Sequence, residues 1–422
     1  MCKKMALILW CGISTAAFAA ENWSFSEQVG VVSRGMKSSE LATYELETAK
    51  ARALGKQWSF LPTVNVAASR SKTVTFGEGG GTVEAKSAGV DVSMNVYRFG
   101  ADSAAYQAGY ESVRAAKFNA QSKSLSSETI AAQALCEAMS AQMEMKIYRR
   151  RMSAARQAEQ AADARYKKGI LSEQELAKLK LEASGLEMAL RSAARKHEKV
   201  FALLEGWGAK ISDDAVWPLS VNPDYFLKAK SWVSAAKSGD LKVKVLEAEA
   251  TAAKSAVTAA RAAMLPSLDL SSNWSKSGTV EAEQLTARSQ MMLTLSVPIF
   301  SKFSDYGSYK AAVHQASASD AALTSERLVS GAKFQALVRD ALAGLDDAKE
   351  LQGQITVAES LYADNLKRFE RGLISVNELS IDEHRVREAE IAAVAAWSNA
   401  HMALFKVAEE SGDSVLSSKI LP

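Results

Sequence analysis

The sequence predicts a mixed α+β membrane protein, in which long antiparallel helical hairpins are joined to four membrane-spanning β-strands per chain. Three observations lead to this fold class. Four segments alternate apolar with polar residues, two long runs lack proline, and one layout occurs twice along the 422 residues. Alternation gives a strand one apolar and one polar face, whereas a proline-free run of good helix formers favours a continuous helix. The chain therefore combines a region of amphipathic β-strands with a region of long helices.

The N-terminus has the features of a secretory signal peptide spanning residues 1–19. Lys3 and Lys4 precede an apolar run from Met5 to Ile13, and small residues at Ala17 and Ala19 predict cleavage after Ala19. This run is too short to cross a bilayer as a helix. Since no later stretch is apolar enough for a membrane helix, we expect any membrane crossing to use β-strands.

Charge and cysteine content exclude some classes of protein. The formal net charge of +3 falls to +1 when Lys3 and Lys4 leave with the signal, so no nucleic-acid partner is expected. Cys136 is then the only cysteine, which excludes a disulfide within the chain.

The strands are predicted as two β-hairpins, at 62–97 and 266–299. In the first, Val90, Val92 and Met94 alternate with polar residues, and Leu268 and Leu270 begin a similar alternation in the second. Breaks between the strands are predicted at Gly79-Gly80-Gly81 and at Ser275–Gly278. The polar residues expected on the water-facing side are Asp91, Asn95, Asp269 and Asn273.

Two long helices are predicted, from Gly100 to Arg165 and from Ser304 to Arg371. At 1.5 Å per residue each forms a rod of about 100 Å, which suits side-by-side packing as a coiled coil. Returning helices are expected at about 172–206 and 225–264. Residues 208–224 are expected to form an irregular belt, with the C-terminal tail after Gly412 near it.

Each long helix turns back at a tip whose sequence occurs twice. "RYKKGILSEQEL" at 165–176 matches "RFERGLISVNEL" at 368–379. In each copy a glycine ends one helix, and Ser-x-x-Glu two residues later is a capping box that starts the next. The tips therefore lie at 169–172 and 372–375. The layout predicts two structural repeats, 20–218 and 219–422, that form one intertwined unit.

With these features, the sequence resembles the TolC-like outer-membrane efflux protein family. The resemblance rests on the duplicated layout, the two tips, Leu61-Pro62 and Leu265-Pro266 before the strands, and "VYRFG" (96–100) and "PIF" (298–300) after them. The chain departs from the family at Lys302-Phe303, where Gly-Gly is common. It also has Glu rather than the more usual Asp six residues after each tip glycine.

The resemblance implies a homotrimer that closes a 12-stranded β-barrel in the outer membrane, continued by an α-barrel in the periplasm. An open sheet edge in lipid leaves backbone groups unpaired, so closure by several chains is needed; closure alone allows two, three or four. The implied function is a passive channel of a tripartite efflux or type I secretion system. Its partners would be outer membrane lipid, a periplasmic adaptor protein and an inner-membrane transporter, with no cofactor.

The resemblance also implies sites. The adaptor would dock on both tips, and two glutamates would lie near the mouth of the pore. The tip residues are Gly169, Ile170, Leu171, Ser172, Gly372, Leu373, Ile374 and Ser375, and the mouth residues are Glu175 and Glu378. The alternative for both glutamates is a capping role alone, and for the apolar tip residues it is packing on their own helices.

Two other classes of function are alternatives to a channel. A secreted or periplasmic coiled-coil scaffold would explain the helices but not the duplicated alternating strands. An enzyme is not expected, because the four histidines are scattered without metal-ligand spacing and no nucleophile motif or phosphate loop occurs. The sequence does not distinguish drugs, metal ions and polypeptides as cargo.

Overall fold

The computed structural model describes residues 25–74, 81–209, 223–279, 285–299 and 303–414. The predicted signal peptide, Gly79-Gly80 and most of the predicted belt lie outside these residues. In chain order the elements are α1 (Phe25–Gly35), α2 (Ser38–Gln57), β1 (Thr63–Val74), β2 (Thr82–Tyr97), α3 (Ala101–Lys167), α4 (Glu173–Gly206), α5 (Pro223–Ala235), α6 (Leu241–Ala262), β3 (Ser267–Thr279), β4 (Thr286–Ser296), α7 (Ser304–Glu370) and α8 (Val376–Ser411).

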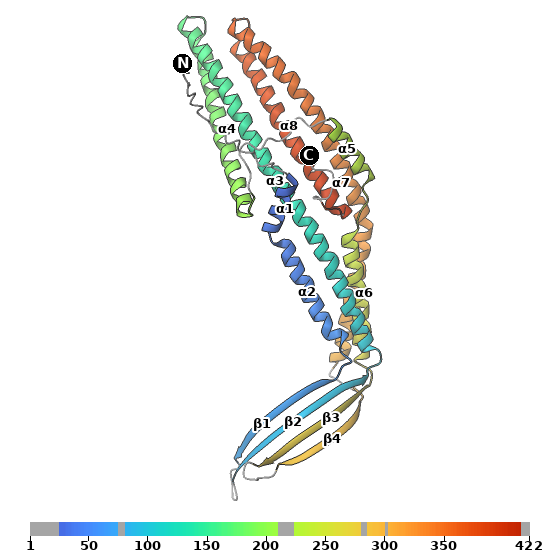
Figure 1. Ribbon diagram of the computed structural model, residues 1–422. Helices are drawn as coiled ribbons and strands as arrows, with labels where there is room; N and C mark the ends of the chain where they lie inside the picture. The colour runs from blue at the N-terminus through green and yellow to red at the C-terminus, as the bar shows by residue number, and fades with distance from the viewer. Residues whose placement is uncertain (1–24, 75–80, 210–222, 280–284, 300–302, 415–422) are drawn as a thin grey trace, which may run out of the picture.

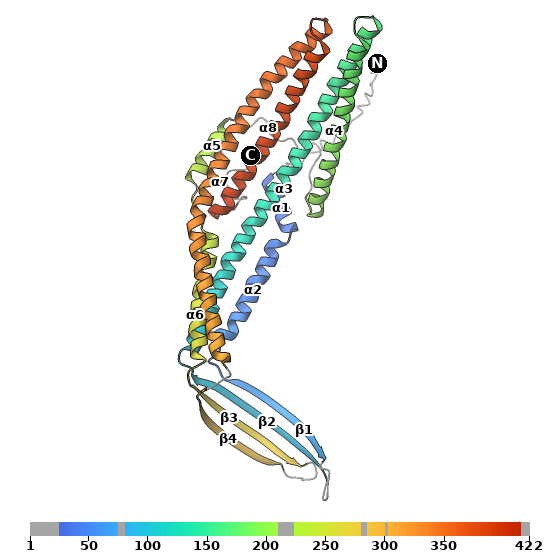
Figure 2. The ribbon, with the colours of Figure 1, turned by 180° about the vertical axis from the view of Figure 1, so that it is seen from behind.

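The molecule is elongated, with the sheet at one end and two helical tips at the other (Figure 1). Helices α3 and α7 have 67 residues each, about 100 Å at 1.5 Å per residue, and run along the whole helical part. Helices α2 and α6 accompany them near the sheet, and α4 and α8 near the tips (Figures 1 and 2). The two long helices therefore hold the sheet and the tips far apart.

Small residues allow the helices to approach closely. In α3 the buried positions include Ala131, Ala132 and Ala138, each fully buried. In the helical hairpin formed by α7 and α8, a Cβ on Gly344 of α7 would lie 3.2 Å from Cα of Ala400 in α8. The largest core cluster lies midway along the helices and adds larger side chains, among them Leu404 and Phe405. The helices therefore pack on one another rather than on a globular core.

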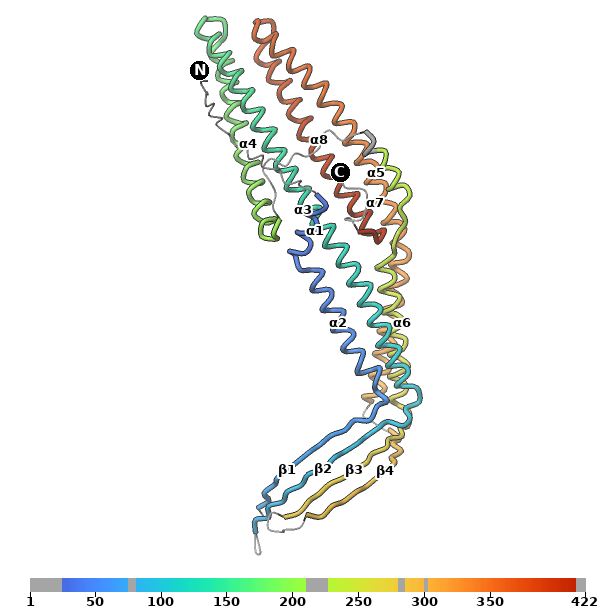
Figure 3. Tube along the Cα trace, in the orientation of Figure 1, coloured from blue at the N-terminus to red at the C-terminus, as the bar shows by residue number. Residues whose placement is uncertain are grey.

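The four strands form one antiparallel sheet in the order β1-β2-β3-β4 (Figure 3). Strands β1 and β4 lie at its edges. No described helix covers either face, and apolar side chains are strongly exposed: Val66 by 79%, Met291 by 73% and Leu295 by 65%. Such a sheet has neither the buried face nor the covered edges of a stable soluble sheet.

The break predicted at Ser275–Gly278 is wrong. These residues belong to β3, which continues to Thr279. They pair with residues 86–89 of β2. Because β2 has 16 residues, the backbone pairing between β2 and β3 continues beyond the predicted end of β3. Backbone pairing with a long neighbouring strand outweighs the weak strand preference of serine and glycine here.

The helix predicted at 225–264 is interrupted. Helix α5 ends at Ala235 and α6 begins at Leu241. Asp240 adopts a positive φ of 48°, and the Gly239 amide donates a hydrogen bond to the Glu410 carbonyl oxygen over 2.8 Å. The close approach of the end of α8 fixes the break, because a Cβ on Gly239 would lie 2.5 Å from the Ser411 carbonyl oxygen.

Helix α8 is long and apolar enough, by composition, to cross a membrane, which the sequence interpretation did not expect. It is, however, a packing helix. Trp397, Leu404 and Phe405 are buried against the core, and 56% of its most apolar stretch is buried inside the protein.

Candidate docking tips and channel surfaces

The two tips have the same backbone design. Gly169 and Gly372 have φ values of 73° and 77°, in the left-handed region that glycine enters without steric cost. The amide after each glycine reaches back to the carbonyl oxygen five residues earlier: Ile170 to Arg165 over 3.0 Å, and Leu373 to Arg368 over 2.9 Å. This bond defines a Schellman motif, which ends a helix with its last carbonyls paired.

Both predicted capping boxes are confirmed. The Glu175 amide donates to the Ser172 Oγ over 3.3 Å, and the Ser172 amide donates to the Glu175 Oε2 over 3.1 Å. Ser375 and Glu378 form the same pair of bonds, over 3.2 and 3.1 Å. Hydrogen bonds from the Ser172 amide and hydroxyl lower the pKa of Glu175. Both glutamates thus have a structural role at the start of α4 and α8.

The apolar tip residues divide into two kinds. Leu171 is only 8% exposed, and Ile374 packs partly buried against the same cluster. By contrast, Ile170 is 63% exposed and Leu373 is 70% exposed. In each tip the residue directly after the glycine therefore projects outward, and the next one packs inward.

The two tips are joined to each other. Arg165, in the last turn of α3, donates from Nη1 to the Phe369 carbonyl oxygen over 2.9 Å, and its guanidinium lies 4.8 Å from the centre of the Phe369 ring. One apolar cluster includes Leu176 from the first tip and Val376 and Leu379 from the second. The sequence interpretation missed this link, because Arg165 was noted only as the counterpart of the exposed Arg368.

A buried ion-pair network joins the first hairpin to the second further from the tips. Arg151 of α3 donates from Nε and Nη2 to the two carboxylate oxygens of Glu390 in α8, over 2.8 and 2.5 Å. Arg150 also donates to Glu390, and Glu359 of α7 lies 3.6 Å from the Arg151 guanidinium. Arg151 and Glu390 are 5% and 3% exposed. No sequence motif signalled this network.

A second buried acidic residue, Glu383, lies seven positions before Glu390 on α8. Glu383 is 4% exposed and accepts a hydrogen bond from Arg387 over 2.9 Å. Burial raises the pKa of Glu383 to about 7 against the opposing effect of the Arg387 charge. Within the described residues, no group of three or more His, Cys, Asp or Glu side chains is placed to hold a metal ion.

The sheet has two chemically distinct faces, fixed by register. Asp91 pairs with Asn273, whose amide donates to the Asp91 carboxylate over 2.9 Å, and Asn95 pairs with Asp269. Directly paired residues lie on the same side of a sheet. All four residues predicted to face water therefore share one face. Val64, Val92, Leu270 and Leu293 lie on the other.

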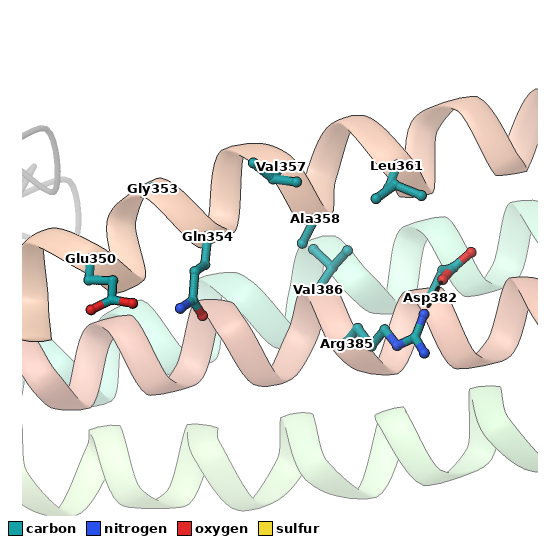
Figure 4. Close-up of a pocket in the computed structure, with 9 residues that line it drawn as sticks. All are labelled: Glu350, Gly353, Gln354, Val357, Ala358, Leu361, Asp382, Arg385 and Val386. Carbon is teal, nitrogen blue, oxygen red and sulfur yellow. Dashed lines mark hydrogen bonds and ion pairs between the residues drawn. The ribbon is translucent and has the colours of Figure 1, made fainter.

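The groove drawn in Figure 4 is a furrow between α7 and α8. It has a volume of about 430 Å³; Val357, Ala358 and Leu361 line one wall, and Arg385 pairs with Asp382 over 3.2 Å on the other. The other polar lining residues, Glu350 and Gln354, lie toward the opposite end of the groove from this ion pair, so the polar groups do not converge on one point (Figure 4). The furrow thus has no arrangement of groups for acid–base or nucleophilic catalysis.

Residues 232–408 match the family described as outer membrane efflux protein. The chain carries an outer membrane efflux protein domain. The resemblance to this family inferred from the sequence is thereby confirmed, and so, at the level of the family, is the predicted location in the outer membrane. No curated protein matches this sequence.

Solved structures share the fold of the outer membrane efflux protein domain and of the rest of the chain. The Campylobacter jejuni CmeC outer membrane channel aligns with a TM-score of 0.76 and 15% identity, over 93% of this chain and 88% of that one. The open state of the Neisseria gonorrhoeae MtrE outer membrane channel gives 0.76 and 16%, over 93% and 89%. The Vibrio cholerae outer membrane protein VceC gives 0.75 and 14%, over 92% and 96%.

Proposed function

We propose that the protein is a homotrimeric outer-membrane channel, the passive outer part of a tripartite efflux system or of a type I secretion system. The observation that carries this proposal is the four-stranded sheet with one apolar face, one polar face and two open edges. Three copies would supply twelve strands, enough to close a barrel with a wet lumen. The apolar face would meet lipid, and Asp91, Asn95, Asp269 and Asn273 would face the lumen.

The helical part supports the same proposal. Rods of about 100 Å with small buried residues suit an α-barrel that continues the lumen through the periplasm toward an adaptor and an inner-membrane transporter. We also propose that residues 20–218 and 219–422 are two structural repeats of one unit, because α2, β1, β2, α3 and α4 have counterparts in α6, β3, β4, α7 and α8. No catalytic step or cofactor is part of this function.

The assembly is tested with the purified mature protein. Cross-linking in detergent should give a three-chain species as the largest product, and the protein should form ion-conducting pores in planar lipid bilayers. A monodisperse monomer that retains its full β content and conducts no ions would contradict the channel and favour a coiled-coil scaffold.

A second prediction concerns Glu175 and Glu378, which we propose also lie near the periplasmic mouth of the pore. In a trimer their six carboxylates would favour cations. The double change Glu175→Gln and Glu378→Gln should lower the preference for potassium over chloride in single-channel recordings. Thermal unfolding should be nearly unchanged, because glutamine also serves at this position of a capping box. Unchanged selectivity would mean that the two residues act as caps alone.

A further inference from the structure

The apolar face of the sheet becomes basic toward the end far from the helices. Close to the helices this face carries Val64, Val92 and Leu293. Further along the same face, Arg70 is paired with Lys86, Lys72 with Glu84, and Lys276 lies one row away opposite Ala88. We call Arg70, Lys72, Lys86 and Lys276 the basic rim.

The basic rim keeps a net positive charge within the described residues. Glu84 pairs with Arg70 over 2.7 Å and with Lys72 over 3.5 Å. Neither Lys86 nor Lys276 has a carboxylate within ion-pair distance in the part of the chain that the structure describes. Lys276 lies instead over the Trp274 ring, 5.8 Å from its centre. The rim therefore has two exposed cations available to an anionic ligand.

The spacing along β2 matches the thickness of a membrane. Tyr97 is on the same face at the helix end, beside Phe99 with ring centres 4.8 Å apart, and is 55% exposed. Tyr97 pairs with Leu268 and Lys86 pairs with Gly278, and an irregularity between Asn95 and Tyr97 makes the two pairs ten rows apart, about 33 Å at 3.3 Å per row. With a strand tilt of about 40° this becomes about 25 Å along the membrane normal, the height of an outer-membrane apolar band. Tyr97 and Lys86 would then lie at opposite headgroup layers.

We propose that the basic rim binds the phosphate groups of a phosphorylated glycolipid in the outer leaflet. This inference rests on the proposed function, which places the helices in the periplasm and hence the far end of the sheet at the outer leaflet. The long side chains of Lys86 and Lys276 can lie along the apolar band while their ammonium groups reach the headgroups. Trp274, between the band and Lys276, has the amphipathic character of an interfacial residue.

The test compares variants of the full-length channel in detergent. Lys86→Gln with Lys276→Gln removes the two unpaired cations, and Lys86→Arg with Lys276→Arg keeps them. Arg288→Gln is the matched control, because Arg288 pairs with Ser275 near the same end of the sheet but on its polar face. The probe is lipid A carrying both phosphates, compared with its dephosphorylated form, and bound lipid is counted by native mass spectrometry across a titration at low salt.

The wild type, the arginine variant and Arg288→Gln should bind phosphorylated lipid A alike. The double glutamine variant should bind it about 25-fold more weakly, since each cation near an anionic lipid surface contributes about fivefold. Equal binding by the wild type and the glutamine variant, or equal binding of the dephosphorylated lipid, would overturn the proposal.

Bilayer conductance of the same preparations separates this result from a failure of the proposed function. A glutamine variant with normal pores and undiminished lipid A binding refutes the basic rim alone. A wild type that neither forms pores nor fractionates with the outer membrane refutes the channel itself.

Discussion

The double change Ile170→Ser and Leu373→Ser is expected to stop export while leaving a folded, membrane-inserted channel. Both side chains project from their tips, 63% and 70% exposed, so their loss removes little packing. Exposed apolar side chains repeated at both tips suit a docking surface for a periplasmic adaptor. If they are central contacts, their loss should weaken docking by at least about 2 kcal/mol, or roughly 30-fold. Cross-linking between the tips and the adaptor, together with export in a strain lacking the native gene, measures this.

The inward-facing neighbours provide the matched control. Leu171→Ser with Ile374→Ser changes the same kind of residue one position along, but these side chains pack in the cluster shared by both tips. We expect this variant to lose about 2 to 4 kcal/mol of stability per buried side chain and to accumulate less trimer. If the Ile170 and Leu373 variant instead loses trimer, and its export falls only in proportion, the outward residues serve packing rather than docking.

Arg151→Met should destabilise the helical part of the protein by about 3 to 5 kcal/mol, because it leaves Glu390 buried with only one strong partner. Glu390→Leu should have a similar effect, since the Arg151 guanidinium would then have only the more distant Glu359. The double variant with both changes should recover most of the loss, as apolar side chains can replace a buried ion pair. Thermal unfolding followed by circular dichroism gives the three values.

Arg150 is the control for this network. It donates to the same carboxylate, but its side chain is 60% exposed, against 6% for Arg151. An exposed ion pair contributes about 1 kcal/mol or less. Arg150→Gln should therefore have a small effect, and a loss as large as that of Arg151→Met would show that burial does not set the strength of this network.

The residue pattern alone was sufficient for much of the fold. Gly169, Ser172 and Glu175 define a tip because a Schellman motif and a capping box involve residues no more than six positions apart. The long helices and the face carrying Asp91 and Asn273 follow from local periodicity for the same reason. Two predictions from the local sequence were wrong because a distant segment packs against the residues concerned. Pairing with β2 extends β3 through Ser275–Gly278, and contact with the end of α8 sets the helix break at Gly239.

Tertiary structure decided which of the predicted residues are available to a partner. Ile170 and Leu171 are alike in sequence, yet only the second reaches the shared tip cluster, because that cluster is completed by the other hairpin. The Arg165 contact joins it to Phe369, 204 positions away, and the Arg151 ion pair joins it to Glu390, 239 positions away. Burial and pairing depend on side chains brought together by folding, so no local pattern could specify them.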